Sequence, residues 1–217
     1  MQSFIIVGVG RFGNSLAREL YNSGHEVLVI DKDEDVIQKI SDHVTHAVIG
    51  DASDATVLES IGASNFDYGI ISIASDIQNS ILITLLLKEM GVPHVIAKSG
   101  SDVHTRVLEK IGADRVIFPE LEMGQRLAQM VARRNVIDYL ELSDDYSIME
   151  ISAPKSWHGK TLVDLDIRAK YGVTVVAVRN RDTGELMISL DALFKIGKND
   201  VLTVLGANED IEELDNL

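Results

Sequence analysis

The sequence predicts an α/β fold, in which a Rossmann-type, doubly wound parallel sheet is followed by a crossover helix and a small α+β domain. Three observations lead to this prediction. Apolar runs of strand length alternate with helical segments over roughly the first half of the chain. The first run leads directly into Gly8-x-Gly10-x-x-Gly13 and an amphipathic helix. The second run ends on Asp31, where this fold places an acid that binds a ribose.

The strands of the first domain are nearly continuous apolar runs, which is typical of a parallel sheet covered by helices on both faces. Glycine ends several of the intervening helices, at Gly62, Gly91 and Gly112. The expected strands are residues 4–7, 26–30, 45–49, 68–73, 94–98 and 115–118. The expected helices follow the glycine turn and then span residues 35–40, 55–61, 77–90 and 102–111.

One long helix is expected over residues 122–135. Its apolar stripe contains Met123, Leu127, Met130 and Val131. Such a stripe could pack on its own domain or on a second copy of the chain, and both alternatives remain open at this point.

The remainder of the chain has the pattern of a small α+β domain. Short β-prone segments surround one expected helix near 161–171, and an acidic helical tail follows at 209–214. The β-prone segments are residues 147–151, 174–179 and 200–206. The expected domains are therefore 1–120, a crossover helix and linker over 121–140, and 141–217.

Composition limits the function. A formal net charge of −14 argues against nucleic acid as a partner, because nucleic-acid recognition needs a basic face. No apolar run approaches the length of a membrane span, and residues 1–3 do not begin a secretion signal. The absence of cysteine fits a cytoplasmic protein. We therefore expect any membrane association to run through a protein partner.

The glycine turn predicts a phosphate cradle. Gly8 allows the tight turn, Gly10 lets the backbone approach a pyrophosphate, and Gly13 lets the helix pack closely on the strand. The N–H groups at the start of the helix would face the anion. Asp31 is the candidate ribose ligand, with helix capping as its alternative role.

Three further positions are candidates for contact with a nucleotide. Arg11 lies inside the glycine turn, where a guanidinium can bind terminal phosphate oxygens, although it could also be a solvated surface cation. Asp51 follows the third strand and could contact adenine or cap the next helix. Lys98 ends the fifth strand and could meet a phosphate or lie in solvent. Residues 75–79 lie beside the point where the strand order reverses.

No arrangement of residues typical of catalysis is evident in the sequence. The six histidines show no metal-ligand spacing, and no nucleophile and base form a recognisable pattern. We expect Trp157 to pack in the core of the small domain, and the Asp144-Asp145 pair to lie in a solvated turn. The residues alone thus indicate a protein that binds an adenine nucleotide without an evident reaction.

Several long segments are similar to those of one protein family. They are Val9-Gly10-Arg11-Phe12-Gly13 and residues 45–48, 77–78, 85–89, 107–115, 119–120, 123–124, 142–147 and 167–172. On these segments the chain resembles the RCK (or KTN) family of cytosolic regulatory subunits of potassium uptake, of the single-unit KtrA/KtrC type related to TrkA. The resemblance spans nearly the whole sequence and implies an RCK-N domain followed by an RCK-C (TrkA-C) domain.

The resemblance implies a regulatory subunit rather than an enzyme. Family members form homodimers that assemble into an octameric ring on the cytosolic face of a membrane potassium channel or transporter of the KtrB/KtrD or TrkH type. ATP in the first domain favours the conducting state and ADP the inactive state. Cyclic di-AMP bound to the C-terminal domain is an inhibitory signal in relatives. The protein is therefore expected to be cytoplasmic and peripheral to the membrane through its partner.

The resemblance also assigns roles to individual residues. Arg11 would meet the γ-phosphate, including that of a neighbouring subunit, and Glu120 would help to bind Mg²⁺ or Ca²⁺ beside the ATP phosphates at the dimer interface. Arg168 is either part of the cyclic di-AMP site or a surface cation. The complete candidate set for the nucleotide is Gly8, Gly10, Arg11, Phe12, Gly13, Asp31 (ribose), Lys32, Asp51 and Ala52 (adenine), Lys98 (phosphate) and Glu120, and for cyclic di-AMP it is Ile167, Arg168 and Ala169.

The chain departs from the family pattern at two places. It carries Asp51 where several relatives have an amide or a smaller residue, and Lys32-Asp33 where a more neutral pair is usual. Two rival functions also fit the glycine turn: an NAD-dependent oxidoreductase and a free-standing nucleotide sensor. The small second domain and Arg11 favour the regulatory subunit, with NAD(H) binding more weakly than ATP or ADP.

Overall fold

The structure is a computed structural model that describes residues 1–132 and 136–215. The chain divides into two compact units, Met1–Pro119 and Glu120–Leu217. The division into domains 1–120, 121–140 and 141–217 stays a prediction.

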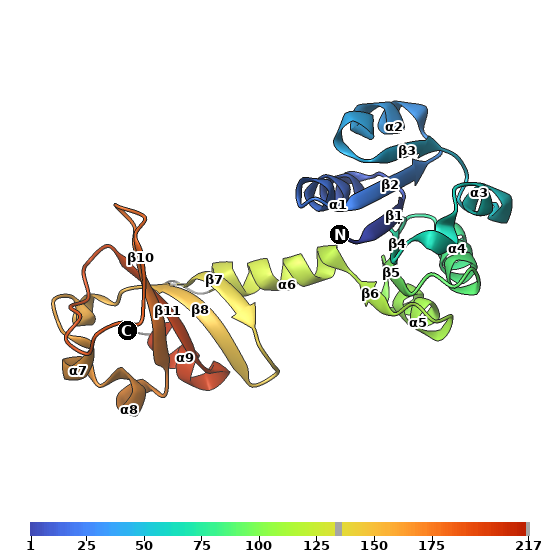
Figure 1. The fold of residues 1–217 in the computed structure, drawn as a ribbon. Helices are drawn as coiled ribbons and strands as arrows, with labels where there is room; N and C mark the ends of the chain where they lie inside the picture. The colour runs from blue at the N-terminus through green and yellow to red at the C-terminus, as the bar shows by residue number, and fades with distance from the viewer. Residues whose placement is uncertain (133–135, 216–217) are drawn as a thin grey trace. The chain divides into compact units, whose positions relative to one another are not determined.

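The first unit contains a six-stranded, all-parallel sheet with strand order β3-β2-β1-β4-β5-β6 (Figure 1). This is the strand order of a dinucleotide-binding Rossmann fold, and it confirms the predicted fold class. The strands are β1 (Ser3–Val7), β2 (Glu26–Asp31), β3 (His46–Ile49), β4 (Tyr68–Ile71), β5 (His94–Lys98) and β6 (Arg115–Ile117). The helices are α1 (Arg11–Asn22), α2 (Glu34–Ile40), α3 (Ala55–Ser60), α4 (Ile77–Glu89) and α5 (Asp102–Lys110).

Alternate residues of the central strands face two separate apolar cores. Ile5 and Val7 of β1 pack in one core with helices α3, α4 and α5, which contribute residues such as Leu58 and Leu87. Phe4 and Ile6 pack in the other core, against α1 and α2. Because side chains alternate along a strand, an apolar residue at every position means that both faces are covered. Helices therefore close both faces, and the strand ends are left to carry polar groups.

The starts of the helices in the first unit differ in one respect. Asp33, Asp54, Asp76 and Ser101 each cap the helix that follows them, accepting backbone N–H groups with a side-chain oxygen. Helix α1 instead begins after Gly10, which makes no side-chain cap. The first N–H groups of a helix have no partner within it. In α1 these donors are therefore left for another acceptor.

Helix α6 (Pro119–Ala132) begins on the last residue of the first unit, and the rest of it belongs to the second unit. The second unit also contains a five-stranded antiparallel sheet of order β10-β9-β11-β8-β7. Its strands are β7 (Val136–Glu141), β8 (Tyr146–Ser152), β9 (Thr174–Asn180), β10 (Leu186–Ile188) and β11 (Asp200–Ala207). Short helices α7 (Leu162–Leu165) and α8 (Ile167–Tyr171) precede β9, and α9 (Asn208–Asp215) follows the sheet. The expected core position of Trp157 is confirmed, since this side chain is 1% exposed.

The prediction of a single helix near 161–171 is wrong, because two short helices are present and Asp166 separates them. This residue has φ 44° and ψ 49°, in the left-handed region, so it ends α7 and starts α8. A non-glycine residue in this region carries a steric cost. The break turns α8 so that Ile167 reaches the core of the second unit.

We expect Asp166→Val to destabilise the protein by about 1–2 kcal/mol, because a β-branched residue is strained at positive φ. Asp166→Gly is the control and should lie within about 0.5 kcal/mol of the native protein, because glycine relieves the strain but adds freedom to the unfolded chain. Chemical denaturation measures both. Equal stability of the two variants would contradict the strain argument.

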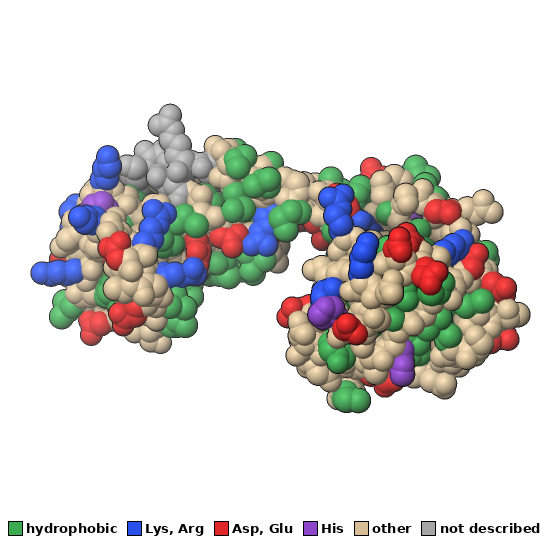
Figure 2. Space-filling view, turned by 90° about the horizontal axis from the view of Figure 1, so that it is seen from above, with side chains coloured by type: hydrophobic (Ala, Val, Ile, Leu, Met, Phe, Trp, Pro, Cys, Tyr) green, Lys and Arg blue, Asp and Glu red, His purple; other side chains and the backbone are tan. Residues whose placement is uncertain are grey.

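Helix α6 exposes its apolar stripe. None of its residues is buried, and Met123, Leu127 and Val131 are 59%, 53% and 73% exposed. Figure 2 shows a group of apolar side chains in the region of this helix, with acidic and basic side chains among them. The helix was expected to continue to residue 135, and its last three expected residues lie outside the described part. No helix among the described residues is long and apolar enough to span a bilayer.

Candidate functional site

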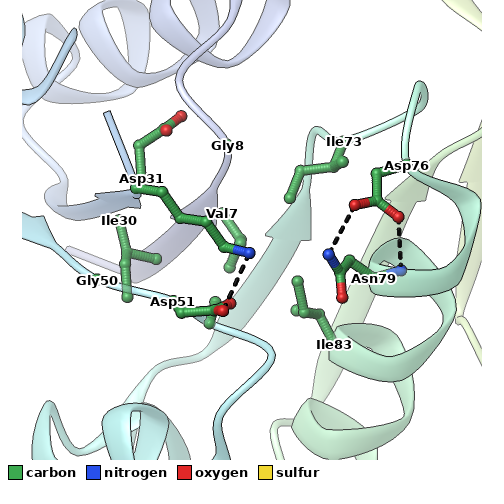
Figure 3. Close-up of a pocket in the computed structure, with 12 residues that line it drawn as sticks. Val7, Gly8, Ile30, Asp31, Gly50, Asp51, Ile73, Asp76, Asn79 and Ile83 are labelled. Atoms are coloured by element: carbon green, nitrogen blue, oxygen red, sulfur yellow. Dashed lines mark hydrogen bonds and ion pairs between the residues drawn. The ribbon is translucent and has the colours of Figure 1, made fainter. Parts of the chain in front are cut away.

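A pocket of about 260 Å³ opens at the carboxyl end of the first sheet, between β1 and β4 (Figure 3). These two strands flank the point where the strand order reverses, which is where open α/β sheets bind ligands. Apolar side chains of Val7, Ile30, Ile73 and Ile83 form part of its lining. Asp31 and Asp51 lie on one side of the pocket, and Asp76 and Asn79 lie on the other.

The three glycines of the turn differ in their surroundings. Gly8 has φ +90°, and a Cβ there would lie 2.7 Å from the side chain of Ile73. A Cβ at Gly13 would collide with the carbonyl oxygen of Gly8. Gly10 has open space around its Cβ direction, with no heavy atom within 4 Å. The lack of a side chain at Gly8 and Gly13 therefore allows β1, the turn and α1 to pack closely. At Gly10 it leaves the start of α1 accessible.

Asp31 is held in place by the backbone. Its Oδ2 accepts the N–H of Val9 at 2.7 Å, and its Oδ1 accepts the N–H of Asp33 at 3.0 Å. Its alternative role as a helix cap is wrong, because Asp33 caps α2. Each carboxylate oxygen can accept more than one hydrogen bond. Asp31 therefore presents fixed, partly free acceptors to the pocket, as binding of a ribose requires.

Asp51, just after β3, lines the pocket beside Lys32. The ammonium of Lys32 lies 3.0 Å from Asp51 Oδ2. Asp51 Oδ1 accepts the hydroxyl and the backbone N–H of Ser53, at 2.6 and 2.9 Å. The alternative in which Asp51 caps the next helix is wrong, because Asp54 caps α3. Ala52, the second candidate adenine contact, also lines the pocket.

The surroundings of Asp51 favour its charged form. The hydroxyl of Ser53 is the main cause that lowers the pKa of Asp51 below its ordinary value, and Lys32 acts in the same direction. A carboxylate with a lowered pKa keeps its interactions from neutral pH down to the acidic range, and loses them only as the pH falls through the lowered value. The ion pair with Lys32 is therefore formed at neutral pH.

Asp76 and Asn79 also line the pocket, although neither is among the predicted nucleotide ligands. Asp76 Oδ1 accepts the N–H of Asn79 at 3.1 Å, and its Oδ2 accepts the side-chain amide at 2.6 Å (Figure 3). The amide of Asn79 is thereby oriented beside Ile83 in the pocket wall. The useful signal was their place after the fourth strand, beside the point where the strand order reverses.

Two cations predicted to meet phosphates lie near the glycine turn but outside the lining of this pocket. Arg11 is the first residue of α1 and lines a separate, open hollow of about 520 Å³ with Arg18 and Lys39. Lys98 ends β5, and its ammonium lies 5.7 Å from the ring centre of Phe12. Phe12 therefore lies beside Lys98, which is a candidate for binding phosphate. The roles of Arg11, Phe12 and Lys98 stay predictions.

The remaining candidates belong to the second unit. Glu120 lies in the first turn of α6. Ile167 and Arg168 line a hollow of about 230 Å³ formed by α7, α8 and β9 with Asp166 and Thr174, and Ala169 lies in α8. Among the described residues, no group of three or more histidine or acidic side chains could hold a metal ion. The Mg²⁺ or Ca²⁺ expected beside Glu120 would lie at a dimer interface with nucleotide phosphates as further ligands, and it stays a prediction.

The uncapped start of α1, the glycine turn and Asp31 meet at one edge of the sheet, and they define the first unit as a Rossmann-type nucleotide-binding domain. Comparison with known families agrees. Residues 4–119 match the TrkA-N domain, and residues 147–217 match the TrkA-C domain. The chain belongs to the TrkA-N/TrkA-C family of potassium uptake proteins.

Two relatives from Bacillus subtilis (strain 168) cover nearly the whole chain. Ktr system potassium uptake protein A is 41% identical over 99% of this chain and 96% of its own length. Ktr system potassium uptake protein C is 44% identical over the same shares of the two chains. The expected resemblance to the KtrA/KtrC type is thereby confirmed.

Solved structures of GsuK share the fold at low identity. The GsuK RCK domain has a TM-score of 0.70 at 20% identity, covering 100% of this chain and 47% of that chain. The GsuK channel has been solved with NAD, with a TM-score of 0.68 at 20% identity, covering 100% of this chain and 39% of that chain. At such identity the likeness establishes the fold alone.

Proposed function

We propose that the protein is a regulatory subunit of a Ktr-type potassium uptake system, which binds ATP and ADP in its first unit and catalyses no reaction. One observation carries this proposal: Asp31, fixed by two backbone N–H groups, lies beside the open start of a helix that has no side-chain cap. The carboxylate can accept ribose hydroxyl groups, and the helix start can donate to phosphate. The apolar walls provide a surface for a base.

The exposed stripe of α6 supports assembly of the subunit. Met123, Leu127 and Val131 present a row of large apolar side chains that the single chain leaves in solvent. A second copy of the chain would bury them on forming a homodimer, and dimers would build the octameric ring of the family. Such a ring would act on a membrane channel or transporter subunit of the KtrB/KtrD or TrkH type, at the cytoplasmic side of the membrane.

Two further ligands belong to the proposal. Cyclic di-AMP would inhibit the system from the hollow at Ile167 and Arg168, where a guanidinium lies beside apolar side chains. Mg²⁺ or Ca²⁺ would need the nucleotide phosphates and a second subunit as ligands beside Glu120, because no described cluster of this chain could hold the ion.

Titration of the purified protein with ATP, ADP and NADH tests the proposal. We expect ATP and ADP to bind in the micromolar range and NADH to bind more weakly. GsuK has been solved with NAD, so the fold alone does not decide between these ligands. Tighter binding of NADH accompanied by hydride transfer would overturn the regulatory function in favour of an oxidoreductase. Adenine-nucleotide binding without any effect on potassium flux would favour a free-standing sensor.

We expect Arg11→Ala to weaken ATP binding by about tenfold or more, while the affinity for ADP changes by less than about threefold. The reason is that a guanidinium at the γ-phosphate makes charge-assisted hydrogen bonds that ADP cannot accept. Isothermal titration calorimetry with each nucleotide measures the difference.

Arg18→Ala is the matched control, because Arg18 lines the same hollow but is held by the side chain of Asn14 at 2.9 Å. It should leave the preference between ATP and ADP unchanged. Equal losses of ATP and ADP affinity in Arg11→Ala would count against a γ-phosphate contact.

A further inference from the structure

The residues at the end of β2 carry two opposing signals for the ribose. In Rossmann-type sites an acid at this position accepts the ribose 2′-hydroxyl, whereas a nearby cation accommodates a 2′-phosphate. Asp31 and Lys32 occupy consecutive positions here, and both line the pocket. Asp31 alone therefore does not decide whether the pocket accepts a ribose with a free 2′-hydroxyl or one with a 2′-phosphate. The outcome also depends on whether the ammonium of Lys32 is available to bind a phosphate.

The structure shows Lys32 engaged by an acid that is itself fixed. Its ammonium lies 3.0 Å from Asp51 Oδ2, while Asp51 Oδ1 accepts two hydrogen bonds from Ser53. The two side chains come from the ends of neighbouring strands β2 and β3. A 2′-phosphate would have to compete with Asp51 for Lys32, because the charge of Asp51 already offsets that of the ammonium.

The charges lining the pocket also oppose a second anionic group. Three carboxylates, those of Asp31, Asp51 and Asp76, line it with the single ammonium of Lys32. A phosphate monoester carries nearly two negative charges at neutral pH. A 2′-phosphate placed beside Asp31 would therefore meet like charge, whereas a 2′-hydroxyl would donate a hydrogen bond there.

We propose that Asp51, by holding Lys32, makes the pocket reject adenine nucleotides that carry a 2′-phosphate. Lys32 and Asp51 are thus specificity-determining residues for the ribose. This inference rests on the proposed adenine-nucleotide site and adds which form of the ribose that site accepts.

The test compares ADP with 2′-phosphoadenosine 5′-diphosphate, which differ only in the phosphate at the ribose, using calorimetric titration of the full-length protein. The native protein should prefer ADP strongly. Asp51→Asn should raise the affinity for the 2′-phosphorylated ligand by about tenfold, because the released Lys32 can make a charge-assisted hydrogen bond to the phosphate. The affinity for ADP is measured for each variant in the same titrations, and the ratio of the two dissociation constants gives the preference.

The double variant Lys32→Gln/Asp51→Asn separates the action of the lysine from the general loss of one negative charge. It should show little of the gain, because no ammonium is left to bind the phosphate. Both side chains are about half exposed, at 58% and 45%, so the variants should fold, and thermal unfolding checks this.

Three results would be decisive. A gain in Asp51→Asn that disappears in the double variant supports the proposal. An unchanged preference in Asp51→Asn, or an equal gain in the double variant, overturns it while leaving the nucleotide site intact. Failure of the native protein to bind either ligand instead refutes the proposed function, and this inference falls with it.

Discussion

Gly13→Ala should abolish nucleotide binding and destabilise the first unit by about 3 kcal/mol. The added Cβ would collide with the carbonyl oxygen of Gly8 and would lie 3.0 Å from the hydroxyl of Ser72. Gly8 is fixed in turn, because its N–H donates to the carbonyl oxygen of Ile30 at 2.9 Å. Helix α1 must therefore move away from the strand, and such overpacking is costly. Thermal unfolding and calorimetric titration with ADP measure the two effects.

Gly10→Ala is the matched control, because the same methyl group is added three residues earlier. Its φ of −66° suits alanine, and no heavy atom lies within 4 Å of the added carbon. We expect stability to change by less than about 1 kcal/mol. Nucleotide affinity should still fall by about tenfold if the phosphates approach the backbone here, as predicted. If Gly10→Ala bound ADP as tightly as the native protein does, the predicted approach of the phosphates at Gly10 would be wrong. If Gly13→Ala were as stable as the native protein, the packing argument would be contradicted.

Trp157→Ala should destabilise the second unit by about 3–5 kcal/mol, the usual loss for truncating a large buried aromatic residue. Trp157 is 1% exposed and packs with Tyr171 at a ring-centre distance of 5.4 Å. Denaturation followed by circular dichroism measures the effect. ADP binding by the first unit should persist, because that unit has apolar cores of its own.

Trp157→Phe provides the comparison for that variant. The indole N–H is buried without a hydrogen-bond partner among the described residues. Phenylalanine loses volume but also removes this unsatisfied donor, so we expect a smaller loss of about 1–2 kcal/mol. If Trp157→Ala had the same free energy of unfolding as the native protein, the indole would not be a main element of this core.

The first unit could be predicted closely from the sequence, and the second only in part. Six continuous apolar runs specified the parallel sheet, and most of the expected strand ends lie within two residues of those observed. In the second unit, β7 and β10 were missed. Strand β10 has three residues, too few to show a period, and β7 directly follows a long helical pattern. The break at Asp166 was missed because apolar spacing continues across it and a left-handed aspartate has no distinct signal.

The candidate site divides in the same way. Asp31 and the glycines were predictable because the motif fixes their spacing relative to a strand and a helix. The pairing of Lys32 with Asp51 was not predictable, because it depends on two neighbouring strands that bring distant residues to one edge. The position of Asp76 across the pocket from Asp31 likewise depends on the crossover between the two halves of the sheet (Figure 3).

The alternation of side chains along the central strands has a consequence for how this protein can change. The two cores of the first unit contain none of the charged residues that line the pocket, since Asp31, Lys32, Asp51 and Asp76 all follow or end the strands. Lys32 and Asp51 cap no helix, so substitutions at these two positions can alter which ligand is recognised without disturbing either apolar core. Ligand preference in such a sheet can diverge between related chains while the folding free energy stays nearly constant.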